Sequence, residues 1–146
     1  MSSSRRMQPL LRRAQDKQDA VARQLAERQQ LLATHAQRLD DLRQYADEYL
    51  NAQVAAISAS QLLNRRAFLD RLDNAVALQA QTVQRNQAHV DAERGRLLAA
   101  SRERQVLEQL QQRYREQEQA RSNRAEQRVL DDLGARLCRR PTTPES

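Results

Sequence analysis

Apolar residues recur at alternating steps of three and four along the amino-terminal third of this chain. Between residues 11 and 49, nine of the twelve positions in this series are apolar. The polar exceptions are Gln18, Arg28 and His35. A repeat of this period is typical of the narrow seam between two coiled-coil helices. The series therefore predicts a long first helix, over residues 10–57.

A second repeat follows further along the chain. Its apolar members are Leu69, Leu72, Val76, Val83, Val90, Leu97, Ala100, Leu107 and Tyr114. Its polar members are Gln79, Asn86 and Glu93. The shared heptad spacing predicts a second coiled-coil helix, over residues 62–138.

The phase of the seam is lost between the two repeats. Ser58 followed three residues later by Gln61 matches a capping box, in which each side chain bonds an otherwise unpaired backbone N–H. A turn at residues 58–61 would fold the chain into a hairpin. One unbroken helix in a parallel dimer is the alternative that the pattern leaves open.

A turn near residue 59 sets the register of the hairpin, with Leu42 opposite Val76 and Leu11 opposite Leu107. Residues 1–9 and 139–146 are then expected to be disordered. The second helix outruns the first by about 25–30 residues, and this overhang carries an apolar stripe. The stripe consists of Leu130, Leu133 and Leu137.

Composition excludes a conventional globule. The chain is 39% hydrophobic and 3% aromatic, with a mean hydropathy of −0.93. It has no proline between Leu10 and Arg140, which removes the strongest helix breaker. We expect an all-α, cytoplasmic protein with neither a signal peptide nor a membrane span, and with Cys138 as an incidental exposed thiol.

The net charge of +6 raises the question of nucleic-acid binding. Its distribution argues against this function, because residues 10–57 hold seven basic and seven acidic side chains. The segment Asn64–Ala67 resembles part of a DNA-reading basic helix but lacks the dense basic run around it. We therefore expect no nucleic-acid partner, and a basic nucleic-acid-associated coiled coil is kept only as an alternative.

Catalytic constellations are missing from the sequence. His35 and His89 lie far apart in the predicted register, so they do not form a metal site, and no glycine-rich phosphate loop occurs. We expect no enzymatic activity, no cofactor and no metal.

Aromatic residues gather near the predicted turn. Three of the four are Tyr45, Tyr49 and Phe68. Tyr45 lies one position off the seam, where part of its ring faces solvent, and exposed aromatics favour partner surfaces. Filling of the seam and binding of a partner are both open for this cluster.

The chain resembles the FliJ family of the bacterial flagellar type III export apparatus. The resemblance runs from about Arg5 to Leu137 and is carried by three segments. These are the segment LRQYADEYL containing Leu42, Tyr45 and Tyr49, the series Phe68, Leu72 and Ala75, and the closing RAEQRVLDDLGARL.

This resemblance implies an antiparallel two-helix coiled coil similar to the central stalk of rotary ATPases. It implies a non-enzymatic protein at the base of the flagellum, cytoplasmic and peripheral to the inner membrane, that links a ring of the export ATPase FliI to the export gate protein FlhA. FliH and export chaperones are further implied partners. The implied gate-binding residues are Leu42, Tyr45, Tyr49, Phe68, Leu72 and Ala75. Arg38 and Gln79 adjoin that surface but depart from the residues associated with it.

We expect the overhang to contact the ATPase ring. The residues assigned to this contact are Leu130, Leu133 and Leu137, with Arg128 and Arg136 beside them. Two alternatives stay open: the stalk protein of a virulence type III secretion system, which would share the architecture, and a structural spacer, which would be a dimer of parallel chains.

Overall fold

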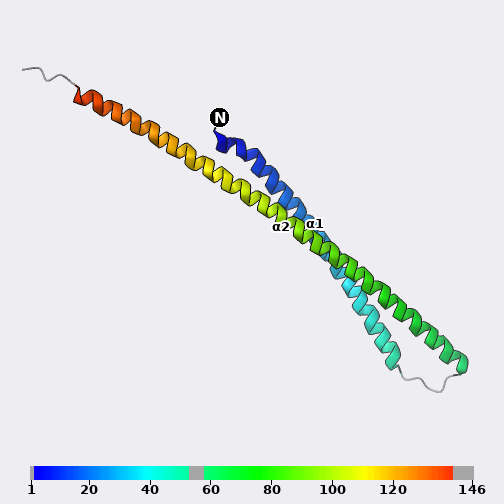
Figure 1. Cartoon of the computed structure of the whole chain (residues 1–146). Coiled ribbons are helices and arrows are strands. Elements are labelled where there is room, and N and C mark those ends of the chain that lie inside the picture. Colours follow the sequence, from blue (N-terminus) through cyan, green and yellow to red (C-terminus); the bar gives the residue numbers. More distant parts are fainter. Residues whose placement is uncertain (1, 53–57, 140–146) are drawn as a thin grey trace, which may run out of the picture. The chain divides into compact units, whose positions relative to one another are not determined.

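The computed structural model describes residues 2–52 and 58–139. They form two α-helices, α1 (Ser3–Asn51) and α2 (Ala59–Cys138), which pack against each other as a two-helix hairpin (Figure 1). The predicted all-α hairpin is confirmed. Two compact units contain the contacts: one joins the chain up to Asp16 with the chain from Arg102 onward, and the other is Lys17–Ser101.

The helices are antiparallel within each unit. In the unit Lys17–Ser101, Gln24 contacts Arg96 and His35 contacts Gln79. In the other unit, Ser4 contacts Glu118. His35 was predicted to face residue 83, and it contacts Gln79, one helical turn away, whereas Gln24 and Ser4 contact residues two and four positions to the other side of their predicted partners. These contacts within one chain are those of a hairpin and not of a parallel dimer.

The seam of α1 follows the predicted series without exception. All twelve predicted positions are buried or half-buried, and the residues between them are exposed. The buried positions are Ala14, Val21, Leu39 and Ala46. Two residues upstream, Ser4 and Met7, continue the same spacing and are also buried.

The predicted seam of α2 is likewise buried or half-buried throughout. Val90 is 1% exposed and Ala100 is 3% exposed, which makes them the most enclosed apolar side chains among the described residues. The core is one side chain wide, so each residue adds a small increment to the stability of the hairpin.

The start of α1 differs from the prediction. The helix begins at Ser3 and not at residue 10, and it contains Pro9. Proline removes one backbone hydrogen bond, but Pro9 and the residue four positions earlier, Arg5, are exposed, so water can satisfy the freed carbonyl. The seam residues Ser4 and Met7 hold this first turn against α2. At the other end α1 stops at Asn51, and the predicted helical residues 53–57 lie outside the described part of the chain.

The capping box at the start of α2 is confirmed. The backbone N–H of Ser58 donates to Gln61 Oε1 at 3.0 Å, and the N–H of Gln61 donates to Ser58 Oγ at 3.3 Å. These reciprocal bonds start α2 at Ala59, three residues before the predicted boundary. Its last residue, Cys138, is the predicted one, and residues 140–146 of the predicted tail lie outside the described part.

Candidate interaction surfaces

Three aromatic rings form a cluster where the two helices approach the turn. Phe68 on α2 lies 4.7 Å from Tyr49 and 6.3 Å from Tyr45 between ring centroids, the second pair being edge-to-face. Such pairs stabilise a packed structure by about 0.5–1.5 kcal/mol beyond their buried area. Phe68 and Tyr49 are half-buried, whereas Tyr45 remains 49% exposed. The cluster therefore joins the helices and still presents an aromatic surface.

The predicted gate-binding residues differ in their exposure to solvent. Leu42 and Ala75 are half-buried, and Leu72 is only 8% exposed. Tyr45 is thus the member of the set with the largest exposed fraction. The structure brings Tyr45, Tyr49 and Phe68 into contact, while Leu72 is a buried residue of the seam.

Three leucines near the turn were missed by the sequence analysis. Leu50 is 54% exposed, Leu62 is 53% exposed and Leu63 is 69% exposed. Leu50 and Leu63 lie off the seam, and the signal that marks them is apolar character at positions that the heptad assigns to solvent. Leu62 lies one heptad before Leu69 and is nevertheless exposed. With Tyr45 the three leucines form the exposed apolar set of this end, which we call the tip surface.

Arg65 closes the carboxyl end of α1 at the same place. Its guanidinium donates to the backbone carbonyls of Tyr49 at 3.1 Å and Leu50 at 3.2 Å, and lies 5.7 Å from the centre of the Tyr49 ring. The final carbonyls of a helix have no partner within it and carry a partial negative charge. Arg65 therefore fixes the last turn of α1, which holds Tyr49 and Leu50 in place.

The far end of α2 is exposed on every side. Each described residue after Glu118 is exposed, and we call residues 119–138 the overhang. Leu130 is 63% exposed, Leu133 is 50% exposed and Leu137 is 66% exposed. Val129, at 58%, belongs to the same stripe and was missed by the sequence analysis. Arg128 and Arg136 are exposed as well.

A family model decides the identity of the chain. The model described as "Flagellar FliJ protein" matches residues 3–143. The chain belongs to the FliJ family. It is therefore a component of flagellar protein export. Members of this family are non-catalytic parts of the export apparatus. No curated protein and no solved structure matches the chain.

The amino end of this FliJ protein is held by one carboxylate from α2. Glu118 accepts hydrogen bonds from the backbone N–H of Ser4 at 3.0 Å and from Ser4 Oγ at 2.7 Å. These bonds hold the pKa of Glu118 below its usual value, and the bond from the backbone N–H has the largest effect. Arg121 adds a smaller effect that also lowers the pKa. The buried amide of Gln111 donates to the carbonyl of Ser4 at 3.3 Å. Glu118 and Gln111 together bind the first turn of α1.

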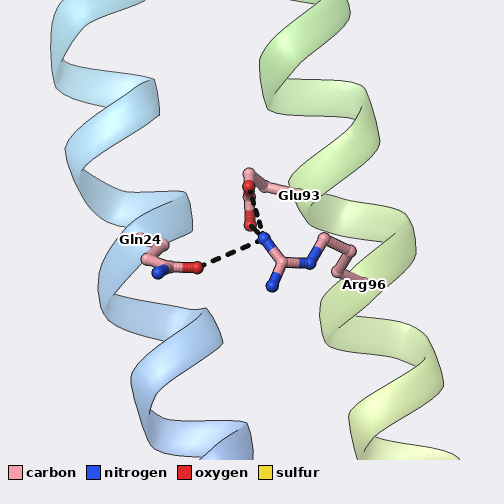
Figure 2. Close-up of polar contacts among 3 residues, drawn as sticks. All are labelled: Gln24, Glu93 and Arg96. Atoms are coloured by element: carbon pink, nitrogen blue, oxygen red, sulfur yellow. Dashed lines mark hydrogen bonds and ion pairs between the residues drawn. The ribbon is translucent and has the colours of Figure 1, made fainter.

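Polar residues of the FliJ seam are paired across the hairpin. Gln79 Nε2 donates to the carbonyl of His35 at 3.0 Å and lies 3.3 Å from His35 Nδ1. Figure 2 shows Arg96 bound at once to Gln24 on α1 and to Glu93 on α2, with its nitrogen 3.0 Å from Glu93 Oε1. The side chain of Glu93 is only 15% exposed, so the guanidinium compensates a charge close to the seam. Gln79, which departs from the residues associated with gate binding, thus has a structural role.

Within residues 2–52 and 58–139, no helix is long and apolar enough to cross a membrane. Over the same residues, no group of three or more His, Cys, Asp or Glu side chains is placed to hold a metal ion. His35 belongs to the seam and His89 is exposed.

Proposed function

We propose that this FliJ protein is a stalk that links the export ATPase ring to the export gate. The observation that supports the proposal is that exposed apolar residues lie near each end of α2, Leu62 and Leu63 of the tip surface after Ala59 and the stripe of the overhang before Cys138. Exposed apolar patches on a small protein mark sites where partners bind. A chain with two such surfaces can bind two assemblies without a catalytic group of its own.

The tip surface is proposed to bind the gate protein FlhA. Tyr45 supplies an exposed aromatic ring that Phe68 holds in place, which is the kind of rigid anchor that dominates binding energy at interfaces. Of the other five residues expected from the family resemblance, Phe68 contacts the Tyr45 ring and Tyr49 contacts Phe68, whereas Leu42, Leu72 and Ala75 are half-buried or buried. Leu50, Leu62 and Leu63 extend the apolar area.

Co-purification with the cytoplasmic domain of the gate tests this contact. We expect the variants Tyr45→Ala and Leu63→Ala, which remove exposed side chains, to lower gate affinity at least tenfold. Leu78→Ala, at a site 64% exposed and outside the tip surface, is the matched control. Circular dichroism would show that the helices are intact. Unchanged affinity in both tip variants would exclude the tip surface as the gate contact.

The overhang is proposed to contact the FliI ring. In its stripe, Leu130 and Leu137 are more than half exposed and Leu133 is 50% exposed. Arg128 and Arg136 are near these leucines in the sequence and are exposed as well. Apolar anchors with arginines beside them are a composition that interfaces favour. The ring contact therefore combines burial of leucines with charge-assisted hydrogen bonds.

Stimulation of the export ATPase measures the ring contact. We expect Leu133→Asp to abolish stimulation, because it places a charge in the stripe, while Leu98→Asp, at a site 53% exposed outside the overhang, leaves it intact. Deletion of residues 125–146 should have the same effect as Leu133→Asp. Full stimulation by the deleted chain would contradict the assignment.

The location of the protein follows from these partners. We propose that it lies in the cytoplasm at the flagellar base, peripheral to the inner membrane and without inserting into it. FliH and export chaperones are proposed as additional partners of the same chain, with no nucleic acid among its ligands. A virulence-type stalk is distinguished by motility: a strain lacking this gene should lose swimming while any injection system that it carries still works.

A further inference from the structure

Positive charge is concentrated at the start of α1. Residues 2–15 carry four arginines and no acidic side chain, and the first carboxylate of the chain is Asp16. The four are Arg5, Arg6, Arg12 and Arg13. Residues 17–101, by comparison, hold eleven basic and ten acidic side chains. The excess charge at the start of α1 is therefore a local feature and not a property of the whole hairpin.

All four arginines lie on the side of α1 that faces away from the seam. Pro9 is at the centre of this side, and at 3.6 residues per turn each arginine lies within about 60° of it around the helix axis. The four arginines and Pro9 are exposed. A shallow groove of about 410 Å³ on this side is lined by Arg5, Gln8, Pro9, Arg12, Arg13 and Asp16. We call the four arginines with Pro9 the basic face.

The arginines of the basic face have no anionic partner within the described residues 2–52 and 58–139. No carboxylate there forms an ion pair or hydrogen bond with any of the four guanidiniums. Arg96 and Arg104, in contrast, are each paired with a glutamate of their own helix. Like charges that gather on one face repel each other, so the basic face is favourable only when anions from outside the chain compensate it.

We propose that the basic face binds an anionic phospholipid surface. The planar guanidinium donates two parallel hydrogen bonds to a phosphate, and clusters of about four or more basic residues on a helix are typical of binding to anionic lipids. Lipids diffuse within a leaflet and gather under the arginines. An acidic polypeptide would instead have to match their spacing, which is about 10 Å along the axis between Arg5 and Arg12.

This contact gives a physical basis to the peripheral location proposed above. The chain rests on the headgroups through charge, and nothing inserts into the hydrocarbon. Each arginine near such a surface strengthens binding about fivefold, so four of them give a reversible attachment that salt weakens. Binding to lipid is measured on the chain alone and depends on neither the gate contact nor the ring contact.

Sedimentation of the full chain with phospholipid vesicles tests the proposal. We expect binding to vesicles of phosphatidylcholine mixed with phosphatidylglycerol, none to phosphatidylcholine alone, and release as salt is raised. Arg5→Gln with Arg12→Gln should weaken binding at least tenfold. Arg38→Gln with Arg43→Gln removes the same charge at two exposed sites of residues 17–101 and should change binding by no more than about twofold. Circular dichroism would show that both double variants remain helical.

Three outcomes would overturn the proposal. The first is equal binding to the neutral and the mixed vesicles, and the second is equal weakening by the two double variants. The third is binding to poly-glutamate or duplex DNA that requires Arg5 and Arg12 while the mixed vesicles stay unbound, which would assign the basic face to an acidic protein or a nucleic acid. Leu133→Asp, which tests the ring contact, should leave vesicle binding intact, so failure of one assignment does not decide the other.

Discussion

Two side chains of α2 supply the charges that α1 lacks at its own ends. Helix α1 has no acidic residue in its first turn and no basic residue in its last turn. Glu118 lies at its positive amino end and Arg65 at its negative carboxyl end, each hydrogen-bonded to the backbone there. Each contact therefore adds to the favourable interaction of a helix end with an opposite charge.

The first prediction concerns Arg65. Arg65→Ala should lower the free energy of unfolding by about 1–2 kcal/mol, because it leaves the carbonyls of Tyr49 and Leu50 to water and removes the contact with the Tyr49 ring. Chemical denaturation followed by circular dichroism measures the change. Arg66→Ala, at the exposed neighbouring position, is the control. Equal effects of the two substitutions would contradict the capping role.

A second prediction concerns the pH dependence of the amino end. Since the pKa of Glu118 is lowered in the folded chain, its contact stabilises the hairpin above the ordinary pKa of glutamate and is lost as the pH falls through the lowered value. Amide hydrogen exchange at Ser4, corrected for the intrinsic pH effect, should quicken in that acid range. Glu118→Gln should remove this dependence and Glu116→Gln should keep it. Slow exchange at Ser4 in acid would refute the prediction.

For single residues, exposure to solvent is easier to predict from the sequence than the hydrogen-bond partner. Tyr45 was expected to face solvent because it lies off the seam, and the structure confirms that expectation. The bond between His35 and Gln79 was not predicted, since nothing local to either residue indicates that they pair. Arg65 and Glu118 likewise act on a helix distant in sequence, so their roles depend on the register of the hairpin.

The helices themselves were predictable because one period governs them. Alternating steps of three and four place all seam residues on one face, and each such residue is buried or half-buried. The start of α1 was missed for a physical reason. Pro9 signals a helix boundary when local propensity alone is considered, whereas contacts of Ser4 and Met7 with the seam carry the helix through it.

The seam provides the third prediction. Leu39→Ala should lower the free energy of unfolding by about 2–4 kcal/mol, because Leu39 is 8% exposed and its loss leaves a cavity between the helices. Leu31→Ala, on the same helix but 45% exposed, should change it by no more than about 0.5 kcal/mol. Thermal and chemical unfolding of the two variants test the difference. Similar losses would mean that the heptad does not define the core.

For the whole molecule, contacts between α1 and α2 of one chain distinguish the hairpin from the parallel dimer that the sequence left open. The fourth prediction is that His35→Cys with Gln79→Cys, in a Cys138→Ser background, forms a disulfide within one chain. Replacing His35→Cys by Leu31→Cys should prevent it, because Leu31 lies off the seam. Gel electrophoresis without reductant separates the outcomes. Covalent dimers as the sole product would favour the parallel arrangement.

Capping of α1 by residues of α2 constrains how a protein of this kind changes length during evolution. An insertion of seven residues in α1 alone would move the ends of α1 away from Arg65 and Glu118. It would also shift polar residues such as Gln79 out of register with their partners. A matching heptad gained in α2, on the other side of the turn, restores every one of these bonds. Length variation among such chains should therefore come as paired insertions, placed symmetrically about Ser58.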